Sequence, residues 1–297
     1  MTLRDLEIFC AVCDANNMTT AAEKLYISQS SISQVIANIE KEFGVKLFER
    51  YSKKLYITES GRILQDYAKH VLLSFNEMQD KLRGYGIIKV IHVGASVTIG
   101  TQLLPEITKI FSEIQPDVKI QAFVGNTSIV EEKILKNDLD LALIEGNVYS
   151  PHIISKPFLD DELVLVCGRA NPLYNKNSIG KEELSSLPYI VRENGSGTRE
   201  LFDRVMNANE ITWEPIWVCN NTEGIKNAVI AGIGVTVISR LLIKKELQNG
   251  ELHVINIENI DFKRKFKMVY HRNKYISEPI RKLMELVFAN YAAITEK

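Results

Sequence analysis

The feature that most constrains this chain is residues 18–48, which read MTTAAEKLYISQSSISQVIANIEKEFGVKLF. The segment predicts a helix, a turn at residues 26–27 and a second helix that Ser28 caps. Thr19 or Thr20 can cap the first helix. The apolar positions of the second helix recur at i, i+3, i+4 and i+7, which places them on one face: Ile32, Val35, Ile36 and Ile39. The pattern therefore predicts two short helices joined by a tight turn.

The opposite face of the second helix carries short hydroxyl and amide side chains near its N-terminus: Gln29, Ser30, Ser31, Ser33 and Gln34. Such side chains both donate and accept hydrogen bonds, as the reading of base edges in a major groove requires. A helix that presents its N-terminal residues in this way has the geometry of a DNA-binding helix-turn-helix. The alternative is an ordinary small helical bundle with a polar surface.

The residues after this motif favour the DNA-binding alternative. Residues 44–50 end the helix and begin an extended segment, residues 55–58 form a second β-prone run, and residues 51–54 suit a hairpin tip. Three basic side chains beside this tip could contact phosphates: Arg50, Lys53 and Lys54. The first 87 residues, however, contain eleven Lys or Arg and eleven Asp or Glu. Because the domain has no basic excess, we expect tight DNA binding only from an oligomer.

Residues 59–83 predict one long helix, roughly 36 Å at 1.5 Å per residue. Apolar side chains recur along it at every third or fourth residue: Ile63, Tyr67, Val71, Phe75, Met78 and Leu82. Such a stripe must be covered, either by the chain's own core or by a second copy of the helix. We favour the second copy, because a separate domain lies on each side of the helix in the sequence. Gly84 and Gly86 then end the helix and predict a hinge.

Beyond residue 87 the pattern alternates strands with amphipathic helices. The predicted strands form two units, at residues 89–93, 118–124 and 139–144, and at residues 162–167, 189–191, 216–218 and 235–238. A strand at residues 266–270 and a last helix at residues 276–293 return to the first unit. This succession of βαβ units predicts the α/β class, with a parallel sheet covered by helices.

Two segments suit a ligand site, because ligands of open α/β sheets bind beyond the C-terminal ends of strands, at helix N-termini. Ser96 and Thr98 follow the first strand of the first unit. The glycine-rich residues 192–199 open a helix of the second unit and contain Ser196 and Thr198. Converging backbone N–H groups and the helix dipole at such turns favour an anion.

Further polar residues could complete the wall of this site, at the ends of the next two strands of the first unit: Asn126, Thr127 and Glu145. Full positive charge nearby is limited to Arg192 and Arg199, so we expect moderate affinity for an anion. The alternative is that both turns only begin helices, as many Gly/Ser turns do.

The order of residues at the N-terminus resembles the LysR-type transcriptional regulators. The matching motifs are Leu3-x-x-Leu6-x-x-Phe9, Ala21-Ala22-x-x-Leu25, Ser28-Gln29-Ser30-x-Ile32-Ser33, Ile39-Glu40, Leu47-Phe48-x-Arg50 and Thr58-Glu59-x-Gly61. The resemblance covers about sixty residues densely and the remainder more loosely. It implies a winged helix-turn-helix over residues 1–58, a linker and dimerisation helix with a hinge over 59–87, and an effector domain over 88–297. That domain is expected to have the two-lobed fold of periplasmic binding proteins, with lobe I at 88–161 and 267–297 and lobe II at 162–266.

The resemblance also implies a function. Members of this family are homotetramers, often dimers of dimers, that bend promoter DNA and respond to a small-molecule co-inducer. Six residues match the positions that hold inducers: Ser96, Thr98, Asn126, Thr127, Ser196 and Thr198. Residues 192–199 are most similar to the regulators of sulfur assimilation or carbon fixation, whose effectors are small anionic metabolites.

Other classes of protein have no support in the sequence. HExxH, GxSxG, P-loop and Cys/His metal spacings are absent, so we expect no enzyme, no metal and no cofactor. The strongest acid/base pair, Glu145 with Arg192, would more naturally orient a ligand. No apolar run approaches the roughly 18 residues of a membrane span, and charged residues rather than a signal peptide open the chain. We therefore expect a cytoplasmic protein without a membrane partner.

Two alternatives stay open. One is a solute-binding module whose N-terminal helices dock a protein partner rather than DNA. The other is a small-molecule enzyme on a binding-protein scaffold, which would need an acid/base pair in the cleft.

Overall fold

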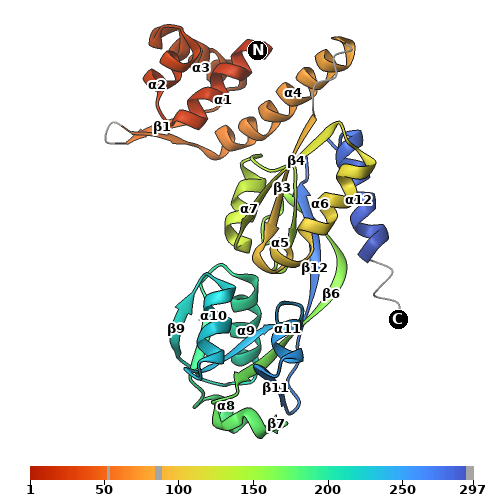
Figure 1. Cartoon of the computed structure of the whole chain (residues 1–297). Coiled ribbons are helices and arrows are strands. Elements are labelled where there is room, and N and C mark those ends of the chain that lie inside the picture. The colour runs from red at the N-terminus through yellow and green to blue at the C-terminus, as the bar shows by residue number, and fades with distance from the viewer. Residues whose placement is uncertain (52–53, 84–88, 292–297) are drawn as a thin grey trace. The chain divides into compact units, whose positions relative to one another are not determined.

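The computed structural model describes residues 1–51, 54–83 and 89–291 of the chain. They form two compact units (Figure 1). Unit 1 comprises Met1–Ile87 with Asn273–Tyr275, and unit 2 comprises Ile88–Arg272 with Ile276–Lys297. No helix of the described residues is both long and apolar enough to cross a membrane.

Unit 1 is a small helical domain with a two-stranded hairpin. Its elements are α1 (Leu3–Ala15), α2 (Met18–Leu25), α3 (Gln29–Phe43), β1 (Phe48–Tyr51), β2 (Lys54–Ile57) and α4 (Glu59–Arg83). Its core joins the first three helices to the hairpin and to one face of α4, through Phe9, Val12, Ala21, Ile32, Ile36, Ile39, Leu47 and Ala68. The winged helix-turn-helix predicted from the sequence is confirmed as a fold.

The cap of α2 corrects one detail of the prediction. Asn17, rather than Thr19 or Thr20, is the N-cap residue, and its Oδ1 accepts the N–H groups of both threonines at 2.8 and 3.3 Å. Asn17 lies one residue before the segment that carried the prediction, and its short amide reaches two unpaired donors of the first turn. Ser28 caps α3 as predicted and accepts the N–H of Ser31 at 3.1 Å.

Unit 2 is built on a ten-stranded sheet in the order β4-β3-β5-β12-β6-β10-β8-β9, with β11 paired to β6 and β7 paired to β11. The strands are β3 (Lys89–Ser96), β4 (Val118–Gly125), β5 (Leu141–Ile144), β6 (Ile153–Gly168), β7 (Ser178–Ile179), β8 (Tyr189–Arg192), β9 (Pro215–Cys219), β10 (Val235–Ser239), β11 (Leu252–Ile257) and β12 (Phe262–His271). The helices are α5 (Val97–Gln102), α6 (Leu104–Ile114), α7 (Thr127–Leu135), α8 (Lys181–Leu184), α9 (Gly197–Ala208), α10 (Thr222–Ile230), α11 (Lys244–Gln248) and α12 (Glu278–Tyr291).

Two antiparallel strands, β6 and β12, run through both lobes of this unit (Figure 1). Their register extends from Phe262↔Leu163 in one lobe to His271↔Ile153 in the other, with a shift between Phe266 and Lys267. β6 begins nine residues before the strand predicted at 162–167. The prediction started too late because residues 153–161 mix polar and apolar side chains without a clear alternation. The predicted lobe boundaries therefore fall inside continuous strands.

Each lobe has its own apolar core. The first lobe packs α6 and α12 on the sheet through Ile91, Val93, Leu104, Ile107, Phe111, Phe266, Met268 and Leu283. The second lobe packs α9 on its part of the sheet through Leu163, Leu165, Tyr189, Val191, Leu201, Phe202 and Met206. The strands β3, β5 and β8 thus carry polar residues at their C-terminal ends, toward the junction of two lobes that have separate apolar cores.

Candidate functional site

The side chains on the polar face of α3 are mostly exposed near its N-terminus. Four of the five predicted base-reading residues are exposed and the fifth, Ser33, is half-buried. The N-cap hydroxyl bonds with the hydroxyls of Ser30 and Ser31 at 2.8 and 2.7 Å, and the Gln34 amide donates to Asn38 Oδ1 at 2.8 Å. Asn38 is a further exposed amide that the prediction missed, although its i+4 spacing from Gln34 places it on the same face. Because these bonds join exposed groups, base edges could replace them without leaving a buried group unpaired.

A carboxylate of α3 holds the start of the β1–β2 hairpin. Glu40 accepts Lys46 Nζ at 2.6 Å and the N–H of Leu47 at 2.9 Å. Partial burial raises the pKa of Glu40, but these bonds outweigh the burial and hold the pKa below its usual value. Of the predicted phosphate contacts, Arg50 lies on β1 and Lys54 on β2. Lys53 lies outside the described residues.

The predicted dimerisation stripe of α4 differs from the face that enters the core. Leu64, Ala68 and Leu72 pack into the core of unit 1. Four stripe residues are instead between 45% and 55% exposed: Ile63, Tyr67, Val71 and Met78. Phe75 is half-buried, and the side chain of Leu82 is outside the described residues. Among the described residues, the core of unit 1 therefore leaves most of the stripe uncovered.

Five predicted effector residues are buried hydroxyls at the junction of the two lobes: Ser96, Thr98, Thr127, Ser196 and Thr198. The first three come from lobe I and the last two from lobe II, at the start of α9. Four of the five have no hydrogen-bond partner for their hydroxyl oxygen: Ser96, Thr98, Thr127 and Ser196. An unpaired buried polar group costs about 1–3 kcal/mol, so four such groups together would be unusual in a junction with only a structural role.

The lobes contact each other directly beside these hydroxyls. Ser128 donates its N–H to the carbonyl of Gly195 at 3.1 Å. The Asn126 amide caps α7 through its oxygen and donates to Glu193 Oε1 at 3.3 Å. Gly146 and Gly197 approach so closely that a Cβ on Gly197 would lie 2.6 Å from Gly146 Cα. The hydroxyl cluster is thus assembled from both lobes in a closed arrangement.

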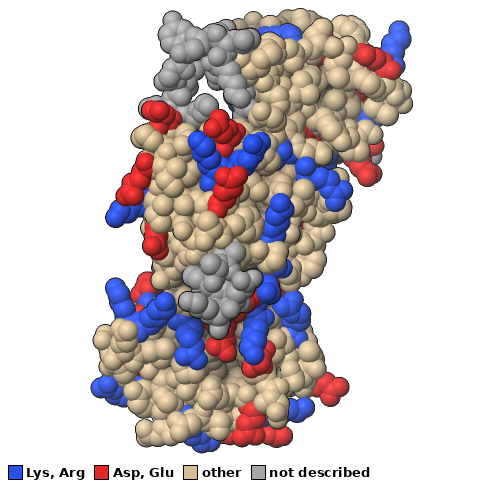
Figure 2. Space-filling view, turned by 90° about the vertical axis from the view of Figure 1, so that its right-hand side faces the viewer, with Lys and Arg blue, Asp and Glu red and all other residues tan. Residues whose placement is uncertain are grey.

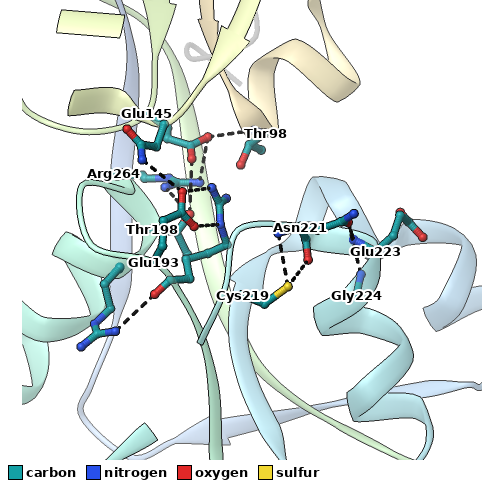
Figure 3. Close-up of polar contacts among 12 residues, drawn as sticks. Thr98, Glu145, Glu193, Thr198, Cys219, Asn221, Glu223, Gly224 and Arg264 are labelled. Atoms are coloured by element: carbon teal, nitrogen blue, oxygen red, sulfur yellow. Dashed lines mark hydrogen bonds and ion pairs between the residues drawn. The ribbon is translucent and has the colours of Figure 1, made fainter. Parts of the chain in front are cut away.

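Glu145 is the centre of the polar network in this junction (Figure 3). Its carboxylate accepts the N–H of Thr98 at 3.2 Å and the hydroxyl of Thr198 at 3.5 Å. Arg264 lies 3.8 Å from it and donates to Thr198 Oγ1 at 3.1 Å and, through Nε, to Asp161 at 2.7 Å. Glu145 therefore occupies donors that were predicted for a ligand.

Two members of this network do not follow from any local pattern in the sequence. Asp161 and Arg264 are register partners on β6 and β12, 103 residues apart in the chain. Burial raises the pKa of Asp161, although Arg264 and the Ser239 hydroxyl oppose the shift. A lone acid and a lone base in two distant strands give no local pattern, so only the register brings them together.

The two arginines predicted as counter-ions already have carboxylate partners. Arg192 is buried and pairs with Glu193 at 2.8 Å. Arg199 pairs with Asp203 at 2.9 Å and stacks over Trp213. The pair of Glu145 with Arg192 suggested by the sequence is wrong, because Glu145 lies near Arg264 and Arg192 pairs with Glu193.

One more buried, unpaired hydroxyl lies at the start of α10. Thr222 opens α10, and its Oγ1 has no hydrogen-bond partner. Asn221 caps the helix by accepting the N–H groups of Glu223 and Gly224 (Figure 3). Thr222 was missed because no glycine-rich turn precedes it, although an Asn-Thr pair before an apolar helix is itself a start signal.

A winged helix-turn-helix joined to a two-lobed α/β domain with a polar junction defines a ligand-responsive DNA-binding regulator. Residues 3–62 match the bacterial regulatory helix-turn-helix protein, lysR family, and residues 86–292 match the LysR substrate binding domain. The chain belongs to the LysR family of DNA-binding transcriptional regulators, which confirms the resemblance and the predicted fold class. Among the described residues, no three His, Cys, Asp or Glu side chains are grouped to hold a metal ion.

Relatives match nearly the whole chain. An uncharacterized HTH-type transcriptional regulator, YeiE of Escherichia coli, is 34% identical over 286 residues, covering 96% of each chain. The HTH-type transcriptional regulator CysL of Bacillus subtilis is 32% identical, covering 89% of each chain. A probable RuBisCO transcriptional regulator of Synechocystis is 32% identical, covering 93% of this chain and 83% of its own. The last match agrees with the predicted similarity to carbon-fixation regulators.

Solved structures agree with the fold. A full-length OxyR variant from Pseudomonas aeruginosa has a TM-score of 0.70 at 21% identity, covering 97% of this chain and 94% of its own. The CcmR regulatory domain of Synechocystis, in complex with 2-PG, has a TM-score of 0.64 at 23% identity, covering 68% of this chain and 97% of its own.

Proposed function

We propose that a small anionic metabolite binds at the junction of the two lobes and modulates the binding of this regulator to promoter DNA. The observation that carries the proposal is the group of four buried, unpaired hydroxyls: Ser96, Thr98, Thr127 and Ser196. Ligand oxygens that pair with these hydroxyls would remove the cost of leaving them unpaired. The related CcmR regulatory domain was solved with 2-PG, which supports a small-molecule ligand for this domain.

The expected charge of the ligand follows from the donors at the site. The helix starts of α7 and α9 present the positive ends of their dipoles and backbone N–H groups. The carboxylate of Glu145 already accepts two donors of the cluster, from Thr98 and Thr198. Donors that suit one carboxylate suit another, so an anionic ligand that displaces or joins Glu145 fits this chemistry.

We infer that α3 reads DNA and that the hairpin holds phosphates. Gln29, Gln34 and Asn38 are exposed amides that can form paired hydrogen bonds with an adenine edge. The shorter hydroxyls beside them suit closer contacts: Ser30, Ser31 and Ser33. Basic residues of the hairpin would contribute the sequence-independent part of the affinity: Arg50, Lys53 and Lys54.

We further propose that two copies of α4 pair through the exposed stripe, within a homotetramer built as a dimer of dimers. The stripe needs a cover that the core of unit 1 does not supply. Two linked DNA-binding domains also compensate for the lack of basic excess, because bivalency raises affinity without new contacts. A ligand can shift such an assembly only if it binds two arrangements with different affinity.

We place this regulator in the cytoplasm and assign it no catalytic role. The DNA partner supports the first inference, and the relatives named as transcriptional regulators support the second.

Calorimetry on the full chain tests the ligand proposal. A thermal-shift screen of sulfur- and carbon-metabolism anions would first supply a binding metabolite. Thr98→Val keeps the shape of the side chain and removes its hydroxyl, so affinity should fall by roughly tenfold, or about 1.4 kcal/mol. Thr101→Val is the matched control, because Thr101 lies on the same helix, is exposed and donates its hydroxyl to the carbonyl of Val97 rather than to the lobe junction. Equal affinity in wild type and Thr98→Val would reject the hydroxyl cluster as the site.

A further inference from the structure

A polar cavity lies in the effector domain, and none of the unpaired serine and threonine hydroxyls lines it. Its volume is about 80 Å³. Since one water needs roughly 10–15 Å³, the cavity can hold several waters or one small polyatomic ion. The charged residues in its walls come from the end of β5, from α9 and from β12: Glu145, Glu200, Arg204, Arg264, Lys265 and Lys267. We call it the basic cavity, because four of these residues are basic and two are acidic.

The carboxylates of the basic cavity are already engaged. Glu145 accepts hydrogen bonds from the lobe junction, as described above. Glu200 accepts the amide of Asn147 at 3.0 Å and the phenol of Tyr149. Neither carboxylate therefore serves as the dedicated partner of a lysine in the cavity.

Two cations of the basic cavity lack a carboxylate partner. Lys267 Nζ donates to Asn147 Oδ1 at 2.6 Å, and among the described residues neither Lys267 nor Arg204 forms an ion pair. Burial lowers the pKa of Lys267, with Glu200 opposing the shift and Arg204 adding to it. A partly buried ammonium facing another cation gains most from a bound anion.

A third cation that lines the basic cavity, Arg264, has a buried nitrogen without a hydrogen-bond partner. The side chain of Arg264 is only 5% exposed, and its Nη2 has no hydrogen-bond partner and only the distant Glu145 carboxylate at 3.8 Å. A guanidinium nitrogen of this kind costs free energy unless an acceptor reaches it.

On the face drawn in Figure 2, Lys and Arg side chains gather where the lower lobe begins, with fewer acidic ones among them.

We propose that the basic cavity binds a tetrahedral oxyanion of the phosphate or sulfate class, at a site separate from the hydroxyl cluster. Lys267, Arg204 and Arg264 place three cationic side chains in the wall of the cavity, a set of donors suited to several oxygens on one centre. The walls come from both lobes and from the strand that crosses between them, so a bound ion contacts the closed arrangement. The ion is either free or the head group of a phosphorylated metabolite.

Titration of the full chain with inorganic phosphate tests this site, with chloride at equal ionic strength as the reference. Wild type should show saturable binding of one phosphate per chain. Lys267→Gln and, independently, the exposed Arg204→Gln should each weaken it by roughly tenfold or more, the effect of one charge-assisted hydrogen bond. Lys263→Gln is the matched control, because Lys263 is exposed, pairs with Asp261 at 2.7 Å and lies outside the cavity wall.

Ser196→Ala separates this site from the hydroxyl cluster and should leave phosphate affinity unchanged. Loss of phosphate binding in Ser196→Ala but not in Lys267→Gln would place the ion at the hydroxyl cluster and overturn the proposal. The absence of saturable binding in wild type, or equal losses in Lys263→Gln and Lys267→Gln, would overturn it as well. Glycerol phosphate binding more tightly than inorganic phosphate would support the proposal with a phosphorylated metabolite as the source, and weaker binding would support it with the free ion.

Discussion

At the scale of single residues, the polar groups of this regulator divide into exposed ones on α3 and buried ones between the lobes. The exposed amides and hydroxyls of α3 have water as an alternative partner, so they can exchange it for base edges at little cost. The buried hydroxyls of Ser96, Thr98, Thr127 and Ser196 have no such alternative. A hydrogen bond from a ligand to one of these buried hydroxyls should therefore contribute more free energy than a hydrogen bond from DNA to one exposed side chain of α3.

Gln34 should contribute to sequence preference rather than to general affinity. Gln34→Ala removes a possible paired contact with a base and should cost about 1–3 kcal/mol at its base pair, with relaxed preference there. Lys53→Ala should instead weaken binding to all sequences and reduce the salt dependence. Binding to a set of operator variants at several salt concentrations measures both effects. A site preference that Gln34→Ala leaves intact would contradict the assignment of α3.

Glu40 should make the stability of the DNA-binding domain depend on acid. Its folded pKa lies below its ordinary value of 4.5, so the stabilisation is present above that pH and is lost as the pH falls through the folded pKa. Glu40→Gln should lower the free energy of unfolding by about 1–3 kcal/mol at neutral pH and flatten its decline in acid. Denaturant unfolding at several pH values checks this, with the exposed Glu23→Gln as control. A parallel decline in wild type and Glu40→Gln would refute the role of this carboxylate.

At the scale of elements, α4 and the crossing strands join parts that fold around different cores. One face of α4 belongs to the core of unit 1 and the neighbouring stripe is exposed. β6 and β12 carry Asp161 and Arg264 side by side between the two lobe cores. These elements are therefore the places where assembly and ligand binding can be coupled to the domains.

A charge in the α4 stripe should disrupt the oligomer. Val71→Asp or Phe75→Asp would place a carboxylate in the proposed helix pair, which is strongly unfavourable without a partner. Both variants should dissociate to smaller species while the effector domain stays folded, and DNA affinity should fall through the loss of bivalency. Light scattering and circular dichroism make the comparison. Asn76→Asp, an exposed position outside the stripe, should keep the wild-type assembly. An unchanged mass for Phe75→Asp would reject this interface.

Periodicity in the sequence predicts elements better than it predicts their polar pairing. The helix at Glu59–Arg83 and the apolar face of α3 follow from repeats within one segment. The hydroxyls of Ser96 and Ser196 are predicted because each stands at a strand end before a helix. The ion pair of Asp161 with Arg264 and the N-terminal half of β6 depend on a long-range register, which no local repeat encodes. The missed residues therefore lie mainly where distant strands meet.

At the scale of the whole molecule, the proposed function requires that one ligand change how paired DNA-binding domains contact a promoter. The closed junction places Glu145 on donors predicted for the ligand, so under the proposed function a ligand that displaces Glu145 would rearrange a buried ionic network that includes Asp161 and Arg264. The two lobes share β6 and β12, and such continuous strands allow the lobes to move as bodies. Removing a cluster hydroxyl should therefore impair the response to ligand without impairing DNA binding itself.

Promoter footprinting across a titration of effector is the most direct test of this account. Thr98→Val and Ser196→Ala should occupy the promoter as wild type does without effector, and should need roughly tenfold more effector for the same change in the footprint, the shift that about 1.4 kcal/mol produces. Thr101→Val should respond as wild type does. An identical effector response in wild type, Thr98→Val and Ser196→Ala would contradict the proposal that the ligand binds at the buried hydroxyls between the lobes.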